Sequence, residues 1–144
     1  MGMLYEQGRG VPHDDIKAIT WYLRAAHQKH IDAQRKVAEM YEEGQGTLKD
    51  PIKGMEWRLK AAEQGHIRSQ FVVGNAYQEG DRGLQKDHFK AVNWYLKAAN
   101  QGHIQSQDKM SKAYELGEGV LRDLTKAMEW THKARRSAGL DNHP

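Results

Sequence analysis

Histidine is the residue type that first suggests chemistry in this sequence. The 144 residues include eight histidines and no cysteine, which excludes disulfides, zinc-thiolate sites and cysteine nucleophiles. His27 and His30 lie three residues apart, but a zinc site needs three or four ligands and no others stand nearby. His66 and His103 occupy equivalent Gly-His-Ile turns, too far apart to share one ion. We therefore predict packing or turn roles for the histidines, and no bound metal.

Pairs of glycines separated by one residue are the second chemical signal, because glycine-rich loops before a helix can hold phosphate. They occur at Gly8-x-Gly10, Gly44-x-Gly46 and Gly117-x-Gly119. No Lys-Ser or Lys-Thr follows them. Each following helix is expected to start at an aspartate, whose carboxylate occupies the free backbone N–H groups and repels a phosphate. We predict tight helix-to-helix turns here and no phosphate or other cofactor.

Carboxylate pairs are the third signal, and they do not indicate an acid/base site. Glu42 and Glu43 are adjacent, and neighbouring residues on a helix point in different directions. No nucleophile stands beside a base in any catalytic motif. A site assembled across several repeats is the alternative, but folds of this shape offer surfaces rather than closed pockets. We predict that the protein is not an enzyme.

The charge pattern bears on nucleic-acid and membrane binding. There are 22 Lys and Arg against 19 Asp and Glu, a net charge of +3, and both signs are interspersed. The one dense basic cluster is Lys133-Ala134-Arg135-Arg136, which we interpret as a solvated helix end. A mean hydropathy of -0.90 and the lack of a long apolar run predict no membrane insertion. We expect a cytoplasmic protein that does not bind nucleic acid.

A fixed period organises the chain. Tryptophans stand at positions 21, 57, 94 and 130, in steps of 36, 37 and 36, and Tyr5, Tyr41, Tyr77 and Tyr114 keep the same phase. Aspartate, lysine and alanine follow it too, at Asp14, Asp50, Asp87 and Asp123, at Lys17, Lys53, Lys90 and Lys126, and at Ala25, Ala61, Ala98 and Ala134. One extra residue in Gly80-Asp81-Arg82-Gly83 explains the 37-residue steps. Such a period is typical of a repeat architecture.

One period predicts two helices. The first, over 33–43, has an apolar stripe and ends at Gly44, and the second begins with Asp50 as N-cap and Pro51 in its first turn. Alanines around one tryptophan form the stripe of the second helix. The sequence therefore predicts an all-α array of antiparallel helix pairs. Its expected core aromatics are Tyr5, Trp21, Tyr22, Tyr41, Trp57, Tyr77, Trp94, Tyr95, Tyr114 and Trp130.

Two strings carry a family resemblance. They are Met1-Gly2-Met3-Leu4-Tyr5-Glu6-Gln7-Gly8-Arg9-Gly10-Val11 and Asp87-His88-Phe89-Lys90-Ala91-Val92-Asn93-Trp94-Tyr95-Leu96-Lys97-Ala98-Ala99-Asn100-Gln101-Gly102. They resemble the Sel-one-like repeat family, a relative of the tetratricopeptide repeat, over almost the whole chain. The resemblance implies a right-handed α-solenoid whose concave face, lined by the first helices, binds proteins or peptides. Its cysteine-rich bacterial branch does not fit a chain without cysteine.

We expect one solenoid array over 1–144, with copies at about 1–32, 33–68, 69–105 and 106–139 and a tail at 140–144. Copy one begins inside its first helix, which suggests a fragment of a longer array or a truncated gene model. Copy two has Gly54 and Arg58 where copies one and three have alanine and tyrosine. Copy four has Thr131 and Arg135, so its buried stripe is expected to be thinner and its helix pair is expected to form a polar end cap.

The predicted groove consists of first-helix positions off the packing stripe. Phe71 is a candidate anchor for a partner, and its alternative role is to cover the neighbouring repeat. We expect a protein or peptide partner and a monomer or part of a larger complex. The alternatives are a regulator or activator of an enzyme complex, as in synthase activation or protein quality control, and an RNA-binding repeat, which the mixed groove charges disfavour. The groove residues are Arg35, Glu39, Glu42, Phe71, Asn75, Gln78, Asp108, Lys112 and Glu115.

Overall fold

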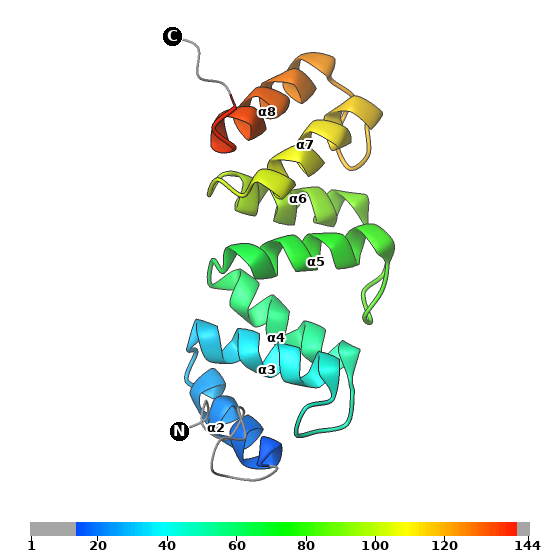
Figure 1. Ribbon diagram of the computed structural model, residues 1–144. Helices are drawn as coiled ribbons and strands as arrows, with labels where there is room; N and C mark the ends of the chain where they lie inside the picture. The colour runs from blue at the N-terminus through cyan, green and yellow to red at the C-terminus, as the bar shows by residue number, and fades with distance from the viewer. Residues whose placement is uncertain (1–13, 141–144) are drawn as a thin grey trace. The chain divides into compact units, whose positions relative to one another are not determined.

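The computed structural model describes residues 14–140, and every regular element there is an α-helix (Figure 1). The absence of strands from residues 14–140 confirms the predicted all-α class. α2 is the second helix of copy one, and the helix pairs α3/α4, α5/α6 and α7/α8 follow. Tyr5 and the predicted first helix of copy one lie outside the described residues. The helices are α2 (Asp15–His27), α3 (Ile31–Glu43), α4 (Pro51–Glu63), α5 (Ile67–Glu79), α6 (His88–Ala99), α7 (Ile104–Leu116) and α8 (Leu124–Ser137).

Aspartates begin the second helix of every copy, as predicted. Each side chain accepts a hydrogen bond from the backbone N–H three residues later, over 3.3 Å at Asp14 and 3.0 Å at the other three. These bonds satisfy one of the N–H groups that have no partner within the helix, and each is worth about 1 kcal/mol. The capping residues are Asp14, Asp50, Asp87 and Asp123.

Two histidines begin first helices, which confirms a turn role for them. Nδ1 of His66 accepts from the backbone N–H of Ser69 over 3.1 Å, and Nδ1 of His103 accepts from that of Ser106 over 3.2 Å. The serine hydroxyl lies 2.7 Å from the same nitrogen in both pairs. His30, which has no serine three residues later, makes no such bond.

The glycine pairs form the turns, and their second members also allow close packing. Gly44 and Gly117 end α3 and α7 with φ of 72° and 70°, in the left-handed region where glycine is favoured. A Cβ atom on Gly46 would collide with the backbone carbonyl oxygen of Asp15, and one on Gly119 with that of His88. The loop of one copy therefore lies against the start of the preceding copy's second helix, and any side chain would prevent this contact.

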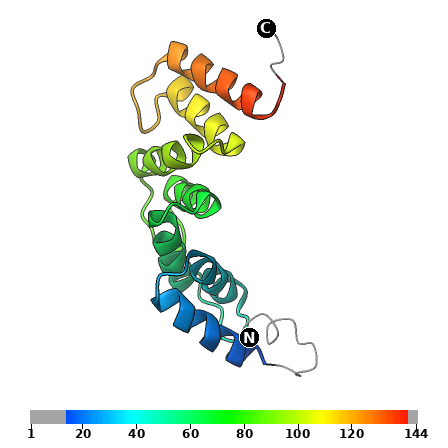
Figure 2. The same cartoon turned by 90° about the vertical axis from the view of Figure 1, so that its left-hand side faces the viewer.

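The chain divides into two compact units, unit 1 (Met1–Ser69) and unit 2 (Gln70–Pro144), with the boundary inside α5. In unit 1, α3 packs against both α2 and α4, and in unit 2, α7 packs against both α6 and α8 (Figures 1 and 2). The buried core of unit 1 includes two clusters, one of Ala26, Ala33, Val37, Ala38 and Trp57 and the other of Ala18, Ile19 and Met40.

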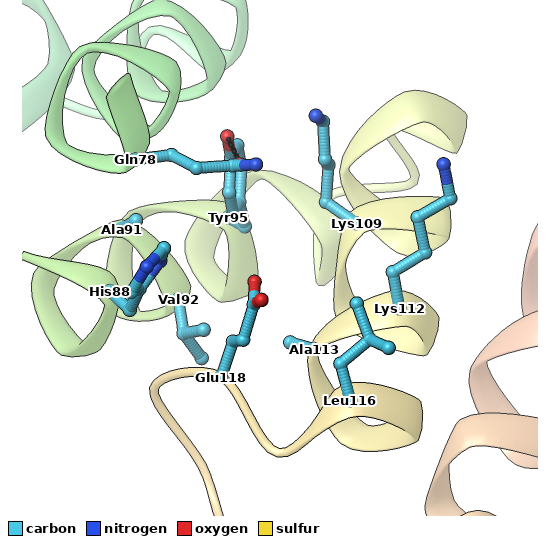
Figure 3. A pocket seen from close by; sticks show the side chains of 10 residues that line it. All are labelled: Gln78, His88, Ala91, Val92, Tyr95, Lys109, Lys112, Ala113, Leu116 and Glu118. Carbon is cyan, nitrogen blue, oxygen red and sulfur yellow. Dashed lines mark hydrogen bonds between the residues drawn. The ribbon is translucent and has the colours of Figure 1, made fainter. Parts of the chain in front are cut away.

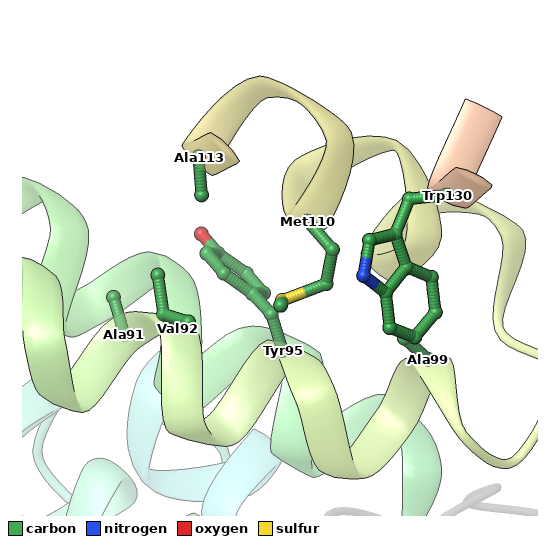
Figure 4. Packing of buried hydrophobic residues seen from close by; sticks show 7 residues of the cluster. All are labelled: Ala91, Val92, Tyr95, Ala99, Met110, Ala113 and Trp130. Carbon is green, nitrogen blue, oxygen red and sulfur yellow. The ribbon is translucent and has the colours of Figure 1, made fainter. Parts of the chain in front are cut away.

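The core of unit 2 is a single described cluster between α6, α7 and α8 (Figure 4). The Met110 side chain extends between the rings of Tyr95 and Trp130. Flexible thioethers suit such irregular gaps between rigid aromatic rings. The buried members are Ala91, Val92, Tyr95, Ala99, Met110, Ala113 and Trp130.

The predicted core aromatics are not equally buried. Trp57 and Trp130 are only 7% and 8% exposed, whereas Trp21 is 41% exposed, which departs from its predicted core position. The second helix of the preceding copy and the first helix of the same copy cover Trp57 and Trp130. For Trp21 the corresponding helices would be that of a preceding copy and the first helix of copy one, and neither lies within residues 14–140. Tyr95 is also buried, and the half-buried ones are Tyr22, Tyr41, Tyr77, Trp94 and Tyr114.

Candidate functional site

The nine residues predicted to line a groove lie on the first helices of copies two, three and four. Those on α3 and α5 are half-buried, and those on α7 are exposed. Three belong to unit 1 and six to unit 2. Their chemistry differs between the units.

In unit 1, these positions are occupied by ion pairs within the chain. Arg35 Nη1 lies 2.9 Å from Glu39 Oε1, and Lys36 Nζ lies 3.8 Å from Glu39 Oε2. Glu42 Oε1 accepts from Nε of Arg58, on α4, over 2.7 Å. Each predicted groove charge on α3 is therefore already neutralised by a neighbour, which leaves little net charge for a ligand.

The ion pair between Arg58 and Glu42 explains why copy two departs from the repeat pattern at both Gly54 and Arg58. Arg58 is only 6% exposed, and Gly54 is buried as well. A Cβ atom on Gly54 would lie 2.9 Å from Glu42 Cγ and 3.0 Å from the carbonyl oxygen of Ala38. Gly54 thus leaves the room that Glu42 needs to reach Arg58. The two departures belong to one arrangement, in which a buried ion pair replaces apolar packing.

The same cations act on the histidine that begins α5. Burial lowers the pKa of His66, and the positive charges of Arg35 and Arg58 lower it further. The imidazole is therefore neutral at pH 7, and its Nδ1 is free to accept the Ser69 N–H.

In unit 2, the predicted residues of α5 converge on one phenol. The Tyr95 hydroxyl lies 2.5 Å from the amide oxygen of Asn75 and 2.7 Å from that of Gln78. A phenol has one proton, so one of these amides must turn its NH₂ group toward the Tyr95 oxygen. Burial, and then the charge of Glu79, raise the pKa of Tyr95, so the hydroxyl stays protonated. Tyr95 and both amides form a fixed uncharged network.

Gly74 allows the Tyr95 ring to lie against α5. A Cβ atom on Gly74 would lie 2.7 Å from Cε1 of that ring. Phe71 packs on the same ring, with centroids 5.9 Å apart, and on His103 at 4.9 Å. Its side chain borders the core of unit 2. Both ring contacts of Phe71 are with residues of its own copy, and its predicted roles as an anchor for a partner or a cover for the neighbouring repeat stay predictions.

A small hollow lies beside Tyr95, between α6 and α7 (Figure 3). Of the three predicted residues on α7, only Lys112 lines this hollow. The volume of the hollow, about 120 Å³, is well below the roughly 300–1,000 Å³ of small-molecule sites and suits a single side chain. Sequence reasoning missed Lys109, because it precedes Met110 of the buried stripe. The hollow is lined by Gln78, His88, Ala91, Val92, Tyr95, Lys109, Lys112, Ala113, Leu116 and Glu118.

The periodic lysines also have a role that the sequence did not reveal. In copies two to four, the ammonium group lies over the ring of the tyrosine near the end of the first helix, at 5.6 Å for Lys53 and Tyr41 and 5.5 Å for Lys126 and Tyr114. Lys90 lies 5.5 Å from the ring of Tyr77. Such contacts are worth about 0.5–1 kcal/mol at exposed sites. The sequence feature that could have indicated this contact is that the lysines and the tyrosines recur with the same spacing of 36 or 37 residues.

Buried glutamines link the two helices of a copy. Gln64 Nε2 donates to Gln34 Oε1 over 2.6 Å, and Gln101 Nε2 donates to Gln70 Oε1 over 2.9 Å. In copy four the buried acceptor is Gln107, whose Oε1 has no partner in the described residues. Ser137 stands at the position of the glutamine donors and is too short to reach it.

Two classes of site can be assessed over residues 14–140. In that range no three His, Asp or Glu side chains are grouped so that they could hold a metal ion. None of the helices described there combines the length and apolar character needed to cross a membrane.

Comparison with known proteins identifies the repeat. The family described as Sel1 repeat matches four segments, residues 1–30, 31–66, 67–103 and 104–137. No curated protein matches the chain.

Solved structures show the same fold. One is c5321, a protective antigen of uropathogenic Escherichia coli with an SLR fold, which is 38% identical over 94% of this chain and 29% of its own, with a TM-score of 0.82. A Sel1 repeat protein from Oxalobacter formigenes is 32% identical over 94% of this chain and 55% of its own, with a TM-score of 0.78. Helicobacter pylori cysteine rich protein B, 22% identical with a TM-score of 0.63 over 89% of this chain and 92% of its own, supports the fold alone.

This chain spans about a third and about half of the first two proteins. Its described helices have the helical repeat solenoid fold of these proteins. The four matched segments cover nearly all of its length. The chain belongs to the Sel1 repeat family, whose members are generally scaffolds for protein–protein interaction rather than enzymes.

Proposed function

We propose that the protein is an interaction scaffold that binds a segment of another protein along the exposed side of its first helices, α3, α5 and α7. In this proposal the partner contacts the nine predicted groove residues, three of them in unit 1 and six in unit 2. A regulator or activator of an enzyme complex would use the same surface and would differ only in its partner.

The arrangement around Tyr95 supports this proposal most directly. Asn75 and Gln78 are half-buried and held by the Tyr95 hydroxyl, so their positions are set before any partner arrives. Each amide has hydrogen-bonding atoms that the single hydroxyl does not use. Fixed amides on a helix can pair with the backbone of a bound segment at little entropic cost.

Site-specific crosslinking tests the surface. The chain has no cysteine, so a single introduced cysteine carries a photoreactive label at one known position. Glu39→Cys, Asp108→Cys and Lys112→Cys place the label on the first helices. Matched controls on exposed positions of the second helices are Glu56→Cys, Asn93→Cys and Glu129→Cys.

Each labelled protein is irradiated in an extract of the cells that produce it. We expect the three first-helix positions to crosslink to one common protein and the three controls not to. Recovery of that protein equally from both sets, or from the controls alone, would overturn the proposed surface.

A further inference from the structure

Two lysines of α7, Lys109 and Lys112, border the hollow beside Tyr95, and Glu118 lines it as well. Lys109 Nζ lies 5.8 Å from the centroid of the Tyr95 ring. Neither Lys109 nor Lys112 forms an ion pair with any residue in 14–140. Like charges three residues apart on a helix repel each other. A bound anion would relieve this repulsion.

The floor of the hollow is apolar. The side chains of Ala91, Val92 and Ala113 are buried beneath it, beside the Tyr95 ring. Both ammonium groups lie on the same side of the hollow as the Tyr95 hydroxyl (Figure 3). Charges beside an apolar surface are screened less than charges in open water. The volume of about 120 Å³ admits one side chain, with methylene groups on the floor and a charged end near the lysines.

Unit 1 shows what occupies the equivalent position when the chain supplies its own anion. Lys36 and Glu39 stand at the repeat positions of Lys109 and Lys112. Lys36 Nζ lies 3.8 Å from the Glu39 carboxylate, which also binds Arg35. Unit 2 has a second lysine where unit 1 has this carboxylate.

We propose that the hollow between α6 and α7 takes the carboxylate of an acidic side chain in the bound protein segment, held by Lys109 and Lys112. This inference rests on the proposed scaffold function and adds the chemistry of the partner. The partner provides in unit 2 the carboxylate that Glu39 provides in unit 1.

Glu118 gives the proposal a second test, of opposite sign. Its side chain rises from the loop after α7 toward the hollow, and it is exposed and unpaired among the described residues (Figure 3). A carboxylate there repels an incoming one. Removal of this charge must strengthen the binding of an acidic segment, whereas removal of a lysine must weaken it.

Peptide titrations followed by amide NMR shifts of the full chain test the proposal. The first probe contains three alternating alanine-glutamate pairs, acetylated and amidated so that its side chains are its only carboxylates. The second has glutamine in place of glutamate, and the third is the glutamine peptide with a free C-terminal carboxylate. We expect the glutamate peptide to bind most tightly and to shift the amides of Lys109, Lys112 and Ala113.

Variants assign the effect to the hollow. Each of Lys109→Gln and Lys112→Gln should weaken binding of the glutamate peptide about two- to fivefold, as expected for exposed ion pairs, and Glu118→Gln should strengthen it about twofold. Lys36→Gln is the matched control and should change nothing, because Glu39 already pairs with Lys36. Lys112→Gln should melt no lower than the parent, since a like-charge repulsion is removed, whereas Lys109→Gln also loses its contact with the Tyr95 ring and should melt slightly lower.

Equal affinity for the glutamate and blocked glutamine peptides, no detectable binding of either, or unchanged binding by the double lysine variant would overturn the proposal. Equally tight binding of the free-acid glutamine peptide would overturn the assignment to a side chain. The scaffold proposal fails separately, by the crosslinking pattern. If the first-helix positions crosslink to a common protein but the lysine variants bind the peptides unchanged, the scaffold proposal stands and only the proposed binding of an acidic side chain fails.

Discussion

Units 1 and 2 are built from the same repeat, but the large residue at one equivalent position of the second helix makes different polar contacts in each unit. In unit 1, Arg58 reaches from the second helix to Glu42, and Gly54 leaves room for that pair. In unit 2, Tyr95 at the position of Arg58 reaches two amides, and Gly74 leaves room for its ring. The glycine has moved from the second helix to the first.

This difference shows that a repeat position cannot be evaluated alone. Gly54 without Arg58 would remove a methyl group from the core, and Tyr95 opposite an alanine would overlap its Cβ atom. Each large residue is compensated by a glycine, which lies on the same helix for Arg58 and on a contacting helix for Tyr95. Unit 1 thereby presents paired charges, whereas unit 2 presents amides and lysines without an ion pair among the described residues.

The largest expected effect tests whether the two cores carry equal weight. Trp57→Ala and Trp130→Ala should each reduce the free energy of unfolding by about 3 to 5 kcal/mol, because both rings are almost fully buried. Trp21→Ala should cost much less, because that ring is 41% exposed. Urea midpoints measure all three. Equal losses at the three positions would contradict the difference in burial.

Loss of the ion pair in unit 1 should have the next largest effect. Glu42→Gln leaves Arg58 buried without a counter-charge and should cost about 2 to 3 kcal/mol, less than for a fully buried pair because Glu42 is partly exposed. Glu43→Gln is the control, since Glu43 is exposed, and should change stability by less than about 0.5 kcal/mol. The two variants are compared by urea unfolding. If they are equally stable, the pair does not hold α3 to α4.

Substitution of Gly74 tests whether this glycine makes room for the Tyr95 ring in unit 2, because its effect on stability should change sign when the ring is removed. Alanine normally stabilises a helix relative to glycine by about 1 kcal/mol. Gly74→Ala should instead destabilise by about 2 kcal/mol, because the new methyl group overlaps the Tyr95 ring. In a Tyr95→Thr background, which copies the smaller residue of copy four, the same substitution should become stabilising. A destabilisation of the same size in both backgrounds would show that the ring is not responsible.

The sequence was sufficient where the cause of a structure is local. Aspartate caps, glycine turns and the spacing of the tryptophans depend on residues within one turn or one period, so the repeat and its helices could be predicted. Arg58 could not be understood this way, because its partner Glu42 lies 16 residues earlier on another helix. The sequence marks Arg58 only as a departure from the repeat pattern, whereas the structure shows that it is half of an ion pair.

The candidate site was predictable to the same degree. Helical spacing placed Asn75, Gln78 and Lys112 on first helices, where the structure also has them, and their part in binding stays a prediction. It could not show that the first two meet at Tyr95 or that Lys109 borders the same hollow, because both facts depend on how α5, α6 and α7 pack. Trp21 departed from its expected burial for a related reason, since the neighbours that cover a tryptophan belong to other helices.

A smaller effect on stability is expected from giving the buried Gln107 side chain the hydrogen-bond donor that Gln70 already has. Ser137→Gln should stabilise the protein by about 1 kcal/mol, because the new amide can donate to the buried Gln107 Oε1 as Gln101 does to Gln70. Ser137→Met is the control of similar length without a donor. Thermal unfolding of the two variants is compared, and a methionine variant as stable as the glutamine variant would exclude the hydrogen bond.

The smallest expected effect is a pH dependence that belongs to unit 1. The pKa of His66 in the folded chain lies below its ordinary value of 6.5, mainly through burial and then through Arg35 and Arg58. The unfolded chain therefore takes up a proton first as the pH falls through 6.5, so the contribution of His66 to stability is complete above that pH and declines below it. His66→Asn can still cap α5 but cannot titrate. The urea midpoints of the parent and of the variant are measured at pH 7.5 and at pH 5.5. We expect the midpoint of the parent to fall more than that of the variant over this range. Parallel curves would mean that His66 is protonated equally in the folded and unfolded chains, which would contradict its burial beside two cations.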